Sequence, residues 1–189
     1  NIEAYSEVCN NPDTFYAQSF YKDWAERYFN EASAKYAVSS MKVLHQAQKE
    51  RIGYVQHLWE IKEAISYLSN SPIKRPGKSP VPHDYTRVEN DLEHVNRVEE
   101  LIALSVEEAK KGLQKATSNK TFYHDYIYLP VVLYQDLIRF ERTLHKMAIL
   151  KKQYENTSEE KFRRDMNKML PEARAQLEVI YINRKSGDK

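Results

Sequence analysis

The sequence predicts an all-α protein, an elongated antiparallel bundle of about five helices of which two or three are long. Apolar residues recur at steps of three or four over most of the 189 residues, which is the helical period. No stretch of strict alternation exceeds about five residues, so no sheet is expected. The 4 glycines are too few for a turn-rich β-sandwich, and a hydrophobic share of 41% is too high for a disordered chain.

The first helix is predicted to start at a cap formed by Asp13 or Thr14 and to end at Asn30. Its apolar side comprises Phe15, Phe20, Trp24, Tyr28 and Phe29. Residues 31–68 keep the helical period throughout and predict one long helix, with a kink at Gly53 left open. At 1.5 Å per residue, such a helix is about 57 Å long.

A proline-rich connecting loop is predicted at residues 69–83, where four of the seven prolines lie. Proline fixes φ and removes a backbone donor, so this segment reads as extended. Neither flank has a core of its own. We therefore treat residues 1–189 as a single helical-bundle domain.

Three more helices follow the loop. One runs from Asp84 or Thr86 to about residue 117 and begins with a Thr86–Glu89 capping box. Residues 121–155 form the next, which Pro130 should bend or break. Ser158 is expected to cap the last helix, whose inward face is predicted to comprise Phe162, Met166, Met169, Leu170, Ala173, Leu177 and Ile180.

The charge pattern argues against nucleic-acid binding and against a membrane span. The 29 basic and 27 acidic residues leave a net charge of +2, and the basic residues are scattered rather than gathered in a one-sided stripe. No apolar run approaches the ~18 residues that a membrane helix needs, which predicts a soluble chain. Because the sequence opens at Asn1, we expect a fragment of a larger protein.

Three histidines have a carboxylate at helical spacing: His57 with Glu60, His94 with Asp91, and His145 with Glu141. A di-iron bundle needs two Glu-x-x-His pairs, and this sequence has none. These pairs are therefore assigned to exposed helix surfaces, where each contributes a few tenths of a kcal/mol. The sequence predicts no metal site and no cofactor.

Catalytic motifs are also lacking. The sequence contains no Gly-x-Ser-x-Gly elbow, no phosphate-binding loop and no Gly-x-Gly-x-x-Gly. The neighbouring acids Glu99–Glu100 and Glu107–Glu108 point in different directions around a helix and are expected to be solvated. The single cysteine, Cys9, excludes an internal disulfide framework and is expected to be unreactive. No catalytic residue can be assigned.

The aromatic residues carry the strongest signal, because 14 tyrosines exceed what a single helical stripe buries. Tyrosine and tryptophan are favoured where one end of the side chain is apolar and the other is wet, as at interfaces and sugar-stacking surfaces. One interpretation places them in the core with their hydroxyls reaching outward. The other makes Tyr21, Trp24 and Tyr28 a docking surface for another domain or subunit.

The phrase around these residues resembles a known family. Trp24, Ala25, Arg27, Phe29 and Ala32 match a W-A-x-R-x-F-G-x-x-A phrase, with Asn30 where glycine is usual. Bacterial glycoside hydrolases of the α-glucuronidase kind carry it at the start of a helical domain that follows their catalytic (β/α)8 barrel. Residues 126–133 are similar to a proline-containing helix start later in such domains.

The resemblance implies a non-catalytic helical domain of a larger carbohydrate-active enzyme, packed on its catalytic domain or on a partner subunit. It also implies a periplasmic or extracellular location. The family's catalytic carboxylates have no matching positions in this sequence. Two alternatives stay open at this stage: a free-standing helical interaction module, and a catalytic bundle with a buried metal.

Overall fold

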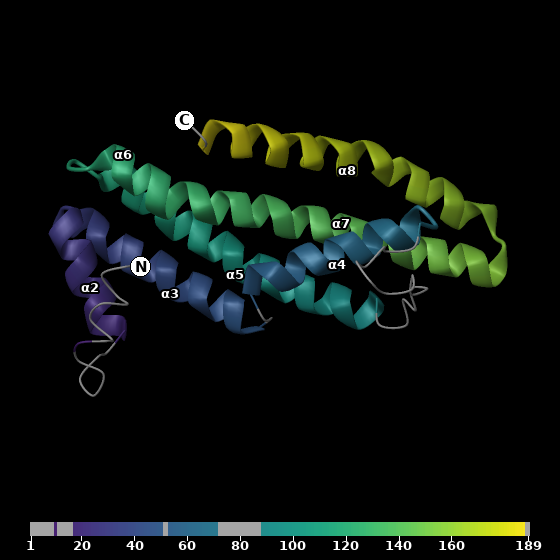
Figure 1. Ribbon diagram of the computed structural model, residues 1–189, viewed down its shortest axis with the longest axis horizontal. Helices are drawn as coiled ribbons and strands as arrows, with labels where there is room; N and C mark the ends of the chain where they lie inside the picture. The colour runs from purple at the N-terminus through teal and green to yellow at the C-terminus, as the bar shows by residue number, and fades with distance from the viewer. Residues whose placement is uncertain (1–9, 11–16, 51–52, 72–87, 188–189) are drawn as a thin grey trace. The chain divides into compact units, whose positions relative to one another are not determined.

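The computed structural model describes residues 10, 17–50, 53–71 and 88–187, and every element in these ranges is helical (Figure 1). The all-α prediction is thereby confirmed. The elements are α2 (Ala17–Tyr28), α3 (Glu31–Glu50), α4 (Gly53–Leu68), α5 (Val88–Lys115), α6 (Lys120–Tyr123), the π-helical segment η1 (His124–Tyr128), α7 (Leu129–Thr157) and α8 (Glu160–Gly187).

The chain forms two compact units. Unit 1 comprises Asn1–Val43 and Leu104–Val131, and unit 2 comprises Leu44–Ala103 and Val132–Lys189. The boundaries fall inside α3, α5 and α7. The assignment of residues 1–189 to one domain stays a prediction, and we describe each unit by itself.

Two helices occupy the region where the sequence predicts a single one. α3 ends at Glu50 and α4 begins at Gly53. Residues 51–52, between the two helices, lie outside the described residues. Gly53 is the first residue of α4, and glycine is among the weakest helix formers because its backbone loses the most freedom on ordering. Of the predicted loop 69–83, the structure describes residues 69–71, and the Thr86–Glu89 capping box lies outside the described residues and side chains.

Pro130 is accommodated without ending the helical path. Immediately before it, η1 replaces an α turn, and the N–H of Leu129 donates to the carbonyl of His124, five residues earlier. Proline lacks an N–H and its ring collides with the carbonyl four residues before it, so a wider turn and a place in the first turn of α7 both relieve the conflict.

Unit 1 is organised around Asn30, which lies between α2 and α3. Its side-chain oxygen accepts hydrogen bonds from Ser33 Oγ (2.9 Å) and from the Thr117 N–H (3.0 Å), while its amide nitrogen donates to the Lys115 carbonyl (3.2 Å). Further along, Ser40 of α3 lies beside Ser105 of α5 at 2.9 Å. The two helices therefore run antiparallel, as expected for the bundle.

In unit 2, α4 runs parallel to α7. Glu60 lies close to Glu141 near the middle of the two helices, and Tyr67 lies beside Lys151 further along both. α4 ends in a Schellman motif, with bonds from the Ser71 N–H to the Ser66 carbonyl and from the Asn70 N–H to the Tyr67 carbonyl. Asn70 takes the left-handed conformation (φ 52°) that this motif requires.

α8 turns back alongside α7 (Figure 1). The turn differs from the prediction in one respect, because Ser158 does not cap α8. Ser158 is left-handed (φ 57°), and the Glu159 N–H donates to Thr157 Oγ1 instead. The predicted inward face is also partly wrong: Ala173 is buried, but Leu170 and Leu177 are 51% and 52% exposed.

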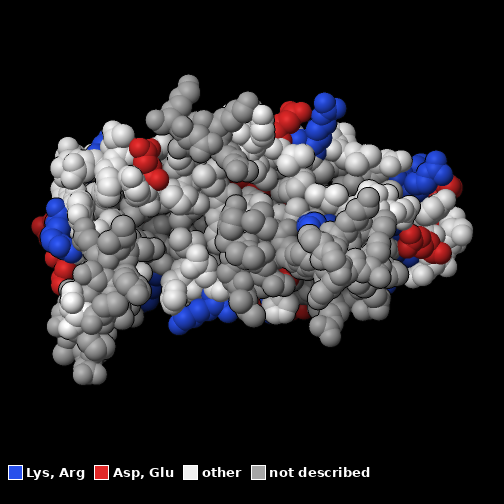
Figure 2. All heavy atoms as spheres, viewed as in Figure 1, with Lys and Arg blue, Asp and Glu red and all other residues white. Residues whose placement is uncertain are grey.

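On the face that Figure 2 shows, the described residues carry charges of both signs, without a one-sided patch of either. Many form pairs one helical turn apart, such as Arg97 with Glu93 and Lys168 with Asp165. No helix within the described ranges combines the length and the apolar character needed to cross a membrane.

Candidate functional site

Two groups of side chains merit attention, one in each unit. The aromatic cluster of unit 1 comprises the rings of Trp24, Tyr28, Phe29, Phe122 and Tyr126. The polar cluster of unit 2 comprises Glu60, Glu141 and His145.

The aromatic cluster contains two of the three predicted interface residues. Trp24 lies 5.4 Å from Tyr28 between ring centroids, Tyr28 stacks on Phe122 at 5.5 Å, and Phe122 stacks on Tyr126 at 4.4 Å. Trp24 and Tyr28 are half-buried in these contacts, whereas Tyr126 is 65% exposed. Tyr21 is also half-buried and contacts Phe20. A docking role for Tyr21, Trp24 and Tyr28 stays a prediction.

The tryptophan phrase, as we call residues 24–32, which resemble the W-A-x-R-x-F-G-x-x-A pattern, contributes to the packing of unit 1. Ala25 is fully buried and Phe29 is 4% exposed, with the Phe29 ring 4.8 Å from that of Tyr123. Tyr123 in turn lies over Gly112 of α5, where a Cβ atom would overlap its ring and hydroxyl. Burial, and secondarily the charge of Glu108, raise the pKa of Tyr123.

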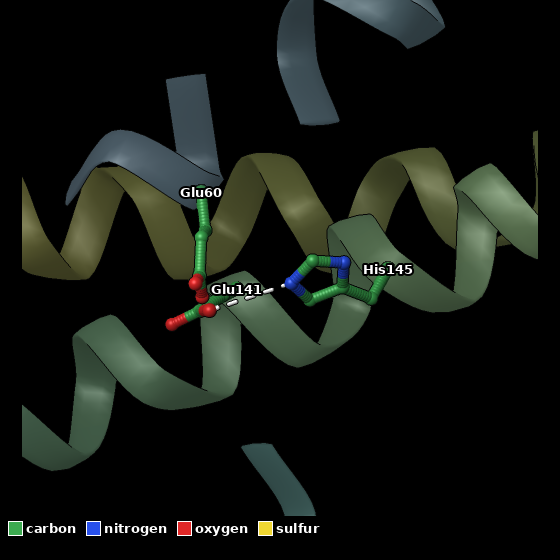
Figure 3. Close-up of side chains that lie close together, drawn as sticks. All are labelled: Glu60, Glu141 and His145. Carbon is green, nitrogen blue, oxygen red and sulfur yellow. Dashed lines mark hydrogen bonds and ion pairs between the residues drawn. The ribbon is translucent and has the colours of Figure 1, made fainter. Parts of the chain in front are cut away.

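The polar cluster lies in the interior of unit 2 (Figure 3). Glu60 reaches from α4 toward Glu141 on α7, and His145 lies one turn further along α7. Glu141 and His145 are fully buried and Glu60 is 6% exposed. His145 Nε2 lies 3.3 Å from Glu141 Oε1, and one ligand atom from each of the three residues lies within 4.8 Å of the others.

This arrangement corrects the assignment of the Glu141–His145 pair to an exposed surface. The four-residue spacing places both side chains on one helix face, as expected, but that face is in the core. Of the other two pairs, His57 and Asp91 lie outside the described side chains. His94 contacts Arg97 at 3.0 Å.

Glu99 is a second correction, since it was expected to be solvated. Its side chain is 13% exposed and binds both Arg142 and Arg139 of α7. The predicted exposure holds for Glu100 and Glu107, whereas Glu108 is partly buried. Cys9 lies outside the described residues.

A buried lysine completes the polar interior of unit 2. Lys151 Nζ donates to the Tyr67 carbonyl and to Asn70 Oδ1, lies 3.4 Å from Glu155 Oε1, and sits 4.2 Å from the centre of the Tyr67 ring. A cation at the carboxyl end of α4 satisfies carbonyls that the helix leaves without partners. Burial, and then the hydrogen bond to Glu155, raise the pKa of Tyr67.

Comparison of the chain with protein-family models, with curated proteins and with solved structures finds no match.

Proposed function

We propose that this chain is a non-catalytic helical domain that docks on another folded protein domain. The observation that carries the proposal is the exposed apolar surface of α8. Leu170, Leu177 and Tyr181 are 51%, 52% and 59% exposed, and their spacing of seven and four residues aligns them on one side of the helix. We call these three residues the α8 apolar stripe.

Val179 and Ile182, near the carboxyl end of α8, are also 43% and 63% exposed, but the helical period places them outside the α8 apolar stripe. Single exposed apolar residues are ordinary on a protein surface, but several aligned on one side of a helix, as in the α8 apolar stripe, are typical of an interaction site.

The charges on α8 favour a protein as the occupant. Several of them form pairs of opposite sign within the helix, including Arg174 with Glu178 and Arg163 with Glu160. A nucleic acid or an anionic membrane surface would be met by an excess of basic residues. Paired charges around an apolar centre correspond to the polar rim and apolar core of a protein interface.

The resemblance of the tryptophan phrase to the helical domains of bacterial glycoside hydrolases suggests which protein the docking partner is. We take the catalytic domain of a bacterial carbohydrate-active enzyme, in the periplasm or outside the cell, as the proposed partner. The alternative partner is a separate protein, which would make the chain a free-standing interaction module.

Site-specific photo-crosslinking tests the proposal. A photoreactive phenylalanine replaces Leu177 in the longest reading frame that contains this sequence, and the crosslinked peptides are identified by mass spectrometry. The expected product joins α8 to a folded domain outside residues 1–189. Lys168 is the matched control, because it is 76% exposed and lies on the opposite side of α8.

Products from Leu177 that stay within residues 1–189, or that match those from Lys168, would contradict docking through α8. Crosslinks to a second copy of the chain would replace the proposed partner with a homodimer. The same reagent at Tyr21 tests the aromatic surface predicted from the sequence.

A further inference from the structure

The polar cluster of unit 2 brings together three side chains of the types that bind metal ions, and the docking proposal does not involve them. Two carboxylates, Glu60 and Glu141, lie together in the interior beside one imidazole. Like charges in a low-dielectric interior repel strongly, and buried carboxylates persist there only when they are protonated, paired or bound to a metal.

Three basic side chains of α7 have partners outside the polar cluster. Lys151 is bound at the carboxyl end of α4, and Arg139 and Arg142 both bind Glu99. With His145 neutral, a divalent cation brings the formal sum of the cluster to zero.

The geometry fits an ion. Two ligands on a tetrahedral centre with bonds of about 2.05 Å are separated by roughly 3.3 Å, and His145 Nε2 and Glu141 Oε1 are 3.3 Å apart. The three ligand atoms lie within 4.8 Å of one another, and a shared ion would require the Glu60 carboxylate to move closer by rotation about its side-chain torsions.

We infer that Glu60, Glu141 and His145 together bind one divalent transition-metal ion, for which Zn²⁺ is the probe. The imidazole selects a transition metal over Mg²⁺ and Ca²⁺, which prefer sets made entirely of oxygen ligands. Three protein ligands leave a fourth position for water. Because the ligands come from α4 and α7, the ion would join the two helices.

Titration of the metal-free chain with Zn²⁺, in competition with a chromophoric chelator, tests the inference. We expect one ion per chain, and a loss of affinity of at least about 100-fold in Glu141→Gln, in Glu60→Gln and in His145→Gln. Far-UV circular dichroism establishes that each variant is folded. The Gln substitutions at 60 and 141 keep the shape of the side chain, so they remove charge with little change in packing.

An exposed pair provides the matched control. His124 Nδ1 and Asp125 Oδ1 are 2.7 Å apart on the surface of unit 1. Asp125→Asn should leave Zn²⁺ affinity unchanged. The absence of stoichiometric binding in the wild type, or binding that survives Glu141→Gln, would overturn the inference.

Two further readouts separate a transition-metal site from a cluster of acids. Co²⁺ should give visible d–d absorption in the wild type and lose it in His145→Gln. Free Zn²⁺ at 100 times its Kd should raise Tm by roughly 5–10 °C. Displacement of Zn²⁺ by millimolar Mg²⁺ would contradict an imidazole-containing site.

Discussion

The interiors of the two units are built from different chemistry. In unit 1, rings and small residues fill the core: Tyr123 lies over Gly112, Phe29 packs on Tyr123, and Ser40 meets Ser105. In unit 2, the interior contains ionisable groups, among them the polar cluster and Lys151. Unit 1 is therefore specified mainly by shape, and unit 2 depends also on how its buried charges are compensated.

This difference determines what each unit tolerates. A core held by close packing responds to a change in volume of even one methylene. A core that contains charges responds to removal of a partner, because the remaining group is then buried without compensation. Substitutions chosen for volume in unit 1 and for charge in unit 2 sharpen the comparison.

The largest effect is expected from Gly112→Ala in unit 1. Helix propensity alone favours alanine by about 1 kcal/mol. The added Cβ would overlap the Tyr123 side chain and come close to Tyr36, so we expect a net destabilisation of about 3 kcal/mol. Urea unfolding measures it.

The control is the double variant with Tyr123→Phe, which removes the hydroxyl nearest to the new Cβ and should restore part of the loss. If Gly112→Ala is as stable as the wild type, the Tyr123 side chain does not pack closely on Gly112, and the description of this core contact is wrong.

Lys151→Met in unit 2 should cost about 2 kcal/mol, because it removes a charged donor from the carboxyl end of α4 while keeping most of the apolar stem. Chemical denaturation is the measurement. Lys146→Met, at an exposed position of the same helix, should change stability by less than about 0.5 kcal/mol. Equal losses in the two variants would refute the role of Lys151.

Ser105→Ala should cost about 1 kcal/mol, since Ser105 Oγ donates to the Ser40 carbonyl at 2.9 Å in the interior of unit 1. The double variant Ser40→Ala/Ser105→Ala removes both hydroxyls and should cost less than the sum of the single substitutions. Strict additivity in the thermal unfolding of the three variants would argue against the contact.

The smallest effect concerns Glu108, a partly buried residue of unit 1. A hydrogen bond from Lys111, assisted by one from Ser39, holds the pKa of Glu108 below its usual value. The folded state thus binds this proton less readily than the unfolded chain, so the pair contributes stability above the unfolded pKa and loses it as pH falls through the folded one. Glu108→Gln should flatten the pH dependence of stability below about pH 4.5. An unchanged pH profile would contradict the shift.

Local patterns in the sequence predict the helices well and their burial less well. The helical period predicts the fold class, and Asn30 marks the first helix boundary as expected. The same period cannot distinguish a core face from a half-exposed one, which is why Leu170 and Leu177 were placed inward. Pro130 signals a distortion, but the π turn before it depends on how the chain relieves the clash.

The sequence predicts only part of the polar cluster. The spacing of Glu141 and His145 brings the two together, yet Glu60 lies 81 residues before Glu141 in the sequence and joins them only through the packing of α4 on α7. Glu141 and His145 are buried because α7 is packed on several sides. The local sequence pattern does not predict how many sides of a helix are covered.

Hydrogen exchange with and without Zn²⁺ tests most directly the claim that an ion bound by the polar cluster joins α4 to α7 in the interior of unit 2. With free Zn²⁺ at 100 times its Kd, openings that separate α4 from α7 should become about 100-fold rarer. Amides around Glu60 and Glu141 should therefore exchange about 100-fold more slowly, while those of α2 in unit 1 keep their rates. Unchanged exchange in α4 and α7 on addition of Zn²⁺ would contradict the account.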